Sequence, residues 1–229
     1  MGAAVLVTAG PASVAGPAVD VEALMGFVFT CARVLGGMQS GGRGLERAGE
    51  ADDEGLLAAI GRGDERAFRT FMDRHLDRIH AFAYRFTGKA PDAEDIAQET
   101  FLRVWRKADV FKPGGAKPTT WLHTIAANLC IDHARRGKLR QWLPFGDKID
   151  PADNAPSPDT ETADRDALRH VGAAIRKLPD RQRLALVLSV TGGHSNPEVA
   201  EIMGLSTGAV EQAIFRARKT LRDQFDGKF

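Results

Sequence analysis

The chain has few of the residues on which enzyme and metal sites depend. Only two cysteines occur in 229 residues, Cys31 and Cys130, which is too few for a disulfide framework or, by themselves, for a zinc site. The six histidines show no metal-ligand spacing with Cys or Asp, and the glycine pairs at 36–37 and 41–42 lack the Lys-Ser/Thr that completes a phosphate-binding loop. We therefore expect no metal, no cofactor and no catalytic activity, and we read Cys130, in an apolar helical pattern, as a core residue.

An excess of charge of one sign is also missing, because 31 basic and 30 acidic residues leave a formal net charge of +1. Locally the charge is uneven. Residues 131–140 are basic, whereas residues 147–166 are strongly acidic. This alternation is typical of a protein that contacts nucleic acid with particular surfaces rather than with its whole body.

The apolar start of the chain lacks the features of a targeting segment. No Lys or Arg precedes Arg33 to form the charged region of a secretory signal. The apolar stretch at 21–35 carries Glu22 and is too short to span a bilayer, and Leu6 stands where a myristoylation signal needs Ser or Thr. We expect residues 1–50 to be a disordered extension, which translation from Met25 or Met38 would shorten, and we expect a cytoplasmic protein without membrane contact.

Helical periodicity predicts an all-α fold of two small domains. Between residues 51 and 138, apolar spacings of three and four predict three long helices. The first ends at Thr87-Gly88, the second begins with Asp92 as its N-cap, and the third begins at Thr119 or Thr120 and ends in the basic run. In that third helix we favour a core position for Trp121 over a role as a stacking platform.

Residues 139–163 are rich in Pro, Asp and Asn, and they predict an acidic, flexible linker. Such a linker predicts that the two domains fold independently, without a packed interface, and change their relative orientation. In the free state the domains could nevertheless pack together and cover the DNA-binding surfaces.

The second domain, residues 164–229, ends in a predicted helix-turn-helix. Ala200 must be small where two helices meet, Gly204 allows a left-handed turn, and Ser206 or Thr207 caps the second helix. The second helix of this motif enters the DNA major groove, and its basic end suits phosphates. The alternative is an ordinary helical hairpin with a solvated basic face.

Several segments resemble the extracytoplasmic-function sigma factors. Residues 197–214 are similar to region 4 of that family, which reads the −35 promoter element, and residues 178–183 resemble the "LP…R" start of that region. Upstream, residues 92–105 resemble region 2.2, and residues 121–128 resemble the promoter-melting helix. The resemblance extends over residues 52–222 and leaves about the first 50 unexplained.

The resemblance implies an RNA polymerase sigma factor whose partners are the β′ and β subunits of the core enzyme, promoter DNA and an anti-sigma factor that exerts stress or extracellular-signal control. The implied core-binding residues are Asp95, Gln98, Glu99 and Leu102. For the −10 element, where the 111–118 loop captures a flipped base, they are Lys112, Lys117, Asn128, Asp132, Arg135 and Arg136. For the −35 element they are Ser206, Thr207, Glu211, Gln212, Arg216, Arg218 and Lys219.

The recognition helix departs from the family pattern. Residues 209–213 read Ala-Val-Glu-Gln-Ala where the family often has Thr-Val-Lys/Arg-Ser-Arg, so two basic contacts are missing. Glu211 could accept from a cytosine amino group, and Gln212 could pair with adenine. The competing interpretation is a helix-turn-helix regulator that acts with a holoenzyme already carrying another sigma factor. That interpretation does not explain the acidic face at Asp95 and Glu99, although exposed acids are often merely solvated.

Overall fold

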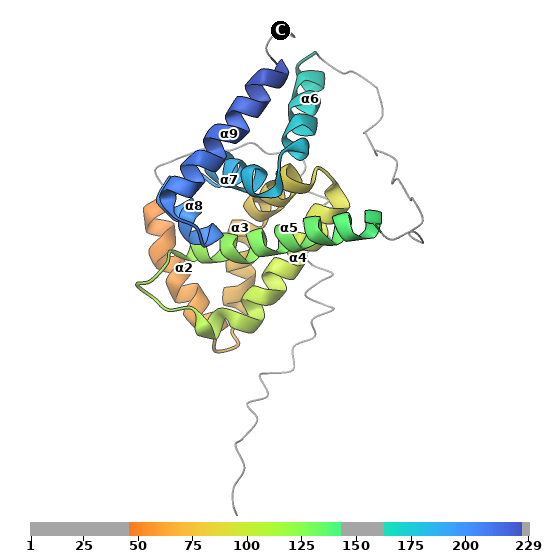
Figure 1. The fold of residues 1–229 in the computed structure, drawn as a ribbon. Coiled ribbons are helices and arrows are strands. Elements are labelled where there is room, and N and C mark those ends of the chain that lie inside the picture. The colour runs from red at the N-terminus through yellow and green to blue at the C-terminus, as the bar shows by residue number, and fades with distance from the viewer. Residues whose placement is uncertain (1–45, 143–162, 226–229) are drawn as a thin grey trace, which may run out of the picture.

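The computed structural model describes residues 46–142 and 163–225, and within these ranges it contains helices and no strand, which confirms the predicted all-α fold (Figure 1). The proposed start sites Met25 and Met38, together with residues 143–162 of the expected linker, lie outside the described residues. Helix α2 begins at Glu46, inside the expected N-terminal extension, and α5 continues to Trp142, inside the expected linker.

The N-terminal domain has four helices and a short 3-10 turn where the sequence predicted three long helices. They are α2 (Glu46–Ile60), α3 (Glu65–Thr87), α4 (Ala90–Lys107), η1 (Ala108–Val110) and α5 (Pro118–Trp142). The extra break, between α2 and α3, is made by Gly63, which has a φ of 86°, and by Asp64, whose carboxylate accepts hydrogen bonds from the backbone N–H groups of Arg66 and Ala67.

The junction of α3 and α4 confirms one predicted boundary and corrects another. Gly88 ends α3 in the left-handed conformation, with a φ of 74°, as the Thr87-Gly88 pair predicts. The predicted N-cap Asp92 is wrong: α4 starts three residues earlier than this prediction, with Lys89 as its N-cap and Pro91 in its first turn. Asp92 lies inside that turn, where its carboxylate is 3.4 Å from Nε2 of His133 on α5.

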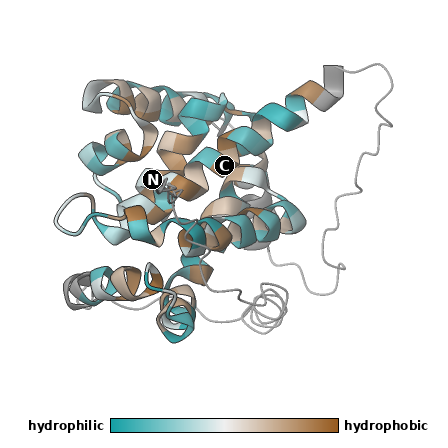
Figure 2. Ribbon diagram, turned by 90° about the horizontal axis from the view of Figure 1, so that it is seen from below, coloured by the Kyte–Doolittle hydropathy of each residue, from teal (hydrophilic) through white to brown (hydrophobic). Residues whose placement is uncertain are grey.

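The core of this domain is built from aromatic and aliphatic side chains at helical spacing. Phe71, Phe82 and Phe86 on α3 and Phe101 on α4 are almost completely buried, and these two helices pack together. Figure 2 shows hydrophobic and hydrophilic residues alternating along the helices, as expected for amphipathic helices that bury one face. Burial of the apolar faces leaves the polar faces available for partners.

The C-terminal domain consists of α6 (Ala163–Lys177), α7 (Asp180–Thr191), α8 (Asn196–Met203) and α9 (Thr207–Phe225). Helices α8 and α9 form the predicted helix-turn-helix. Ser195 and Glu198 make a capping box at the start of α8, Gly204 takes a φ of 62° in the turn, and the Ser206 hydroxyl accepts from the backbone N–H of Ala209 at 3.3 Å. Ser206 is thus the predicted cap of α9.

The two domains pack against each other, so the prediction that they lack a packed interface is wrong. Helices α3 and α5 contact α7 and α8, and buried residues of both domains form one continuous hydrophobic cluster (Figure 1). We call this contact the domain interface. The alternative expectation, that the domains pack together in the free state, agrees with this arrangement. Among the described residues, no helix is long and apolar enough to cross a membrane.

Candidate polymerase and nucleic-acid interface

The outer face of α4 carries the predicted core-binding residues. Asp95 is exposed, while Gln98, Glu99 and Leu102 are half-buried on the same side of the helix. Glu99 forms an i,i+4 ion pair with Arg103, with 2.8 Å between Oε1 and Nε. The opposite side of α4 is buried in the core through Ile96, Ala97, Thr100, Phe101 and Val104. Helix α4 is therefore anchored by one face and presents acids and an amide on the other.

The predicted −10 contacts lie along α5 and the loop before it. Lys112, Asn128, Arg135 and Arg136 are exposed. Asp132 is half-buried and forms an ion pair with Arg135, with 3.1 Å between Oδ1 and Nη2. Lys117 is engaged by the other domain, because its Nζ lies 3.0 Å from Oε1 of Glu198 on α8. In this arrangement one predicted DNA contact is thus already neutralised.

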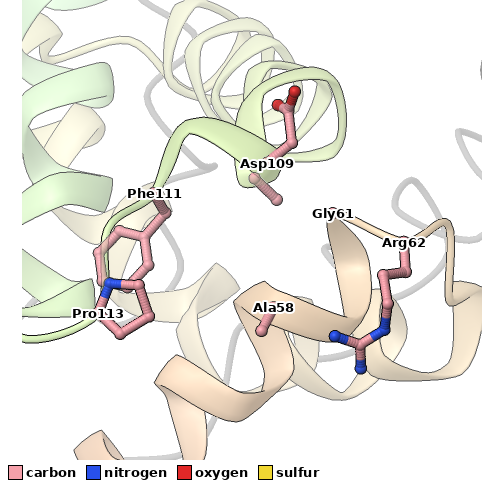
Figure 3. Close-up of a pocket in the computed structure, with 7 residues that line it drawn as sticks. Ala58, Gly61, Arg62, Asp109, Phe111 and Pro113 are labelled. Carbon is pink, nitrogen blue, oxygen red and sulfur yellow. The ribbon is translucent and has the colours of Figure 1, made fainter. Parts of the chain in front are cut away.

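A hollow of about 290 Å³ opens beside the 111–118 loop (Figure 3). Phe111 and Pro113 line it from the loop, and Ala58, Gly61 and Arg62 line it from the end of α2, with Ala108 and Asp109 completing it. Asn128 and Asp132 are not among its lining residues, although the resemblance groups them with this loop as one base-binding pocket. In this structure the loop hollow and the Asn128 surface are separate features.

Trp121 lies at the start of α5 and is half-buried. Its ring packs edge-on against Phe111, with 5.5 Å between the ring centroids and an interplanar angle of 63°. This contact fixes the loop to the helix. It agrees with the structural role that we favoured over base stacking.

The predicted −35 contacts share the outer face of α9 and its first turn. Ser206, Thr207, Glu211, Gln212, Arg216, Arg218 and Lys219 are all exposed. Val210, Ile214 and Ala217 are buried on the opposite side, against α7 and α8. Packing fixes the inner face of α9 and leaves exposed both its N-terminal part and the basic residues of its C-terminal part.

Arg183 of α7 is a buried polar residue of the domain interface. It is 9% exposed, and its guanidinium carbon lies 4.1 Å from the ring centroid of Phe86 on α3. Nη1 donates to the carbonyl of Arg176 at 3.0 Å, and Nη2 donates to Oδ1 of Asp180 at 2.9 Å. Burial lowers the pKa of Arg183, although the nearby Asp180 carboxylate opposes that shift. The other oxygen of Asp180, Oδ2, accepts a hydrogen bond from Nζ of Lys138 on α5 at 2.6 Å. This bond is a further link between the two domains.

Glu198 joins the helix-turn-helix to the N-terminal domain. Its partial burial opposes ionisation, but the backbone N–H of Ser195 and the ammonium group of Lys117 stabilise the carboxylate and lower its pKa to about 2. The same side chain therefore closes the capping box of α8 and holds the 111–118 loop.

Sequence reasoning missed the residues that join the two domains. The sequence marks Arg183 only as the last residue of the 178–183 segment, and it marks His123 and His194 only by their lack of metal-ligand spacing. His123 and His194 are both buried, and their ring centroids are 4.5 Å apart across the domain interface. No local period marks them, since His123 lies on α5 and His194 lies in the connection between α7 and α8, 71 residues further along the chain.

Comparisons with known proteins agree with this architecture. Residues 71–140 match the family described as Sigma-70 region 2, and residues 168–221 match Sigma-70, region 4. The first match contains α4 and most of α5, and the second contains the helix-turn-helix. The two matches occur in the order that the resemblance predicts.

Named relatives and solved structures point the same way. The chain is 36% identical to the ECF RNA polymerase sigma factor SigE of Mycolicibacterium smegmatis over 181 residues, covering 76% of this chain and 69% of the relative. It is 32% identical to the ECF RNA polymerase sigma factor SigW of Bacillus subtilis over 183 residues, covering 73% of this chain and 94% of the relative. The structure of CnrH in complex with the cytosolic domain of CnrY superposes with a TM-score of 0.59 at 29% identity, covering 77% of this chain and 99% of that one. Both domains and the named relatives therefore establish that this chain belongs to the extracytoplasmic-function family of RNA polymerase sigma factors.

Proposed function

We propose that this sigma factor binds core polymerase through the outer face of α4, acts on the −10 element through α5, and reads the −35 element through α9. The observation that carries this division is that each helix buries one face and exposes the polar residues expected to contact the partner. The protein then contributes recognition and positioning, and the polymerase supplies the chemistry in the cytoplasm. The family membership disfavours the alternative of a regulator that depends on another sigma factor.

Docking on core polymerase is assigned to Asp95, Gln98, Glu99 and Leu102. Two acids and an amide around one half-buried leucine form a small apolar centre with a polar rim, which suits a basic partner surface. Glu99 is held in place by Arg103, so part of the conformational cost of ordering this surface is met before binding. The resemblance implies that this surface docks on a coiled coil of the β′ subunit with basic residues at its edge. The acids of α4 complement that positive charge.

Promoter opening is assigned to the exposed surface of α5. Asn128 offers a donor and an acceptor to the edge of an extruded base, while Arg135 and Arg136 lie about two helical turns further on, where backbone phosphates can be held. Asp132 orients Arg135 by their ion pair. Extrusion of a base costs about a few kcal/mol of stacking free energy, and hydrogen bonds to the extruded base and its phosphates offset that cost.

Replacing Asn128 with Ala is expected to reduce strand opening without affecting binding to a −35 duplex. The side chain is exposed, so its loss leaves no cavity in the core. Permanganate footprinting of melted thymines, alongside duplex binding, measures both steps. A variant that opened the promoter normally but lost −35 affinity would show that melting is allocated to the wrong domain.

Substitutions on α9 are expected to separate base reading from phosphate binding. Gln212→Ala should change the preference at one −35 position by roughly 1–3 kcal/mol if the contact is bidentate. Arg218→Ala should weaken binding to all promoters about equally and reduce the salt dependence by roughly one counterion. Affinities for a set of −35 duplexes at several salt concentrations distinguish the two. Equal, sequence-independent losses in both variants would contradict the assignment of Gln212 to a base.

We propose further that an anti-sigma factor keeps the protein inactive. The solved relatives include RpoE of Bartonella quintana in complex with the anti-sigma factor NepR, with a TM-score of 0.57 at 28% identity. In this chain the domain interface already pairs Lys117 with Glu198, and a partner that binds both domains would preserve that pair. The product of a neighbouring reading frame should co-purify with the chain and block its transcription. Co-purification without inhibition would contradict this part of the proposal.

A further inference from the structure

Two histidines from different domains meet inside the domain interface. His123 lies on α5, and His194 lies in the connection between α7 and α8. Their ring centroids are 4.5 Å apart with an interplanar angle of 79°, and the two residues are only 4% and 8% exposed. Phe82 packs edge-on against the other side of His123, at 5.5 Å between centroids. We call His123 and His194 the histidine pair.

The hydrogen bonds of the pair suit neutral rings. Nδ1 of His123 lies 2.8 Å from the carbonyl of Thr119, which can only accept, so Nδ1 carries the proton of the neutral ring. Nε2 of His123 and Nε2 of His194 are buried without a hydrogen-bond partner in the part of the chain that the structure describes. Protonation of His123 would therefore create a second N–H donor with nothing to receive it.

The charges around the pair do not favour a cation either. The charge of Arg78 on α3 lowers the pKa of both rings. Lys117 lowers the pKa of His194, and His75 of α3 lowers the pKa of His123. The carboxylate of Glu198 on α8 has the opposite effect and raises the pKa of His194. That carboxylate is already bound by Lys117 and by Ser195. A proton on the pair would thus enter a buried site that is dominated by positive neighbours.

We propose that the histidine pair makes the domain interface proton-sensitive: the neutral rings hold α5 against the α7–α8 connection, and protonation of either ring favours separation of the two domains. This regulation goes beyond the assignment of the polymerase and DNA surfaces, because it concerns when those surfaces are free. Separation would release Lys117 from Glu198 and uncover the side of α5 that faces α8.

The direction of the pH effect follows from proton linkage. Burial, and then the neighbouring His194, lower the pKa of His123 to about 4, and burial also lowers the pKa of His194. In separated domains both rings would return toward the ordinary value of about 6.5. The closed arrangement is therefore fully favoured above pH 6.5 and loses favour as the pH falls below that value. For His123 alone, a change from pH 7.5 to 5.5 raises the ratio of open to closed molecules about tenfold.

Förster resonance energy transfer between dyes attached to the two domains of the full chain measures the separation of the domains. Suitable positions are Arg66→Cys on α3 and Glu201→Cys on α8, both exposed, in a Cys31→Ser background. Cys130 remains in place because it is buried and its thiol pKa is raised to about 12, so it does not react. We expect transfer to fall between pH 7.5 and 5.5 while the helical circular dichroism stays constant. Transfer that does not change with pH, or that falls together with helicity, would overturn the proposal.

A matched pair of variants identifies the titrating groups. His123→Gln/His194→Gln removes both titrating rings and should abolish the pH dependence, whereas His170→Gln, at an exposed position on α6, should retain it. A pH dependence that survives in the double variant would overturn the proposal. If the double variant fails to fold, NMR titration of the unmodified full chain decides. Ring pKa values for His123 and His194 below 6.5 support the proposal, and ordinary values overturn it.

Discussion

Reversing the charges of Asp95 and Glu99 together, to lysine, should weaken binding to core polymerase by about 100-fold or more. Close charge pairs across protein interfaces contribute about 1.5–7 kcal/mol each, and reversal replaces attraction by repulsion. Every 1.4 kcal/mol corresponds to about a factor of ten in affinity. Neither side chain lies in the core, so the fold should be retained. Affinity is measured by titrating labelled chain with core polymerase, and folding by circular dichroism.

The matched control is Asp73→Lys/Asp77→Lys, which reverses two acids four residues apart on the exposed face of α3. It makes the same change in net charge, so it corrects for long-range electrostatics. We expect the control to bind core polymerase almost normally. Unchanged affinity of the α4 variant, or an equal loss in the control, would place the docking surface elsewhere.

Phe86→Ala should have the largest effect on stability. Phe86 is 1% exposed, and its ring also supports the Arg183 guanidinium at 4.1 Å. Truncation of a buried Phe to Ala costs about 3–5 kcal/mol, through lost transfer energy and the cavity left behind. We expect the free energy of unfolding to fall by that amount and the melting temperature by roughly 10 °C or more. We also expect the domains to separate, because Arg183 of α7 loses the ring on α3 against which its guanidinium packs.

Tyr84→Ala, two residues earlier on α3, is the control. Tyr84 is 48% exposed, so its truncation should change stability by no more than about 0.5 kcal/mol. Calorimetry of the two variants measures the difference. Equal effects would mean that α3 does not hold Phe86 in a packed core.

The elements that sequence reasoning predicted correctly are those specified by local patterns. Gly88 and Gly204 mark their turns because each needs a left-handed backbone, and Ser206 caps α9 with its own hydroxyl. The break before α3 was missed although Gly63 and Asp64 carry the same kind of signal. Asp92 is not the cap because Pro91, the residue before it, is well tolerated in a first helical turn, so α4 begins at Ala90.

The domain interface could not be read from the sequence because its contacts join residues that are far apart. Lys117 pairs with Glu198 and Phe86 with Arg183, and each of these side chains would suit a solvated or local role in its own segment. The long linker also made separate domains the natural expectation. The composition of the linker determines how far apart the two domains can lie. Whether they pack together depends on the complementarity of the surfaces of α3 and α5 with those of α7 and α8.

Transcription with purified core polymerase tests the central claim most directly. The template is fragmented genomic DNA of the source organism, and the 5′ ends of the transcripts are mapped with and without the protein. We predict discrete ends that require this chain, need no other sigma factor, and share one −10 and one −35 element upstream. Chain-dependent ends that appear only when another sigma factor is present, or no chain-dependent ends at all, would contradict the account.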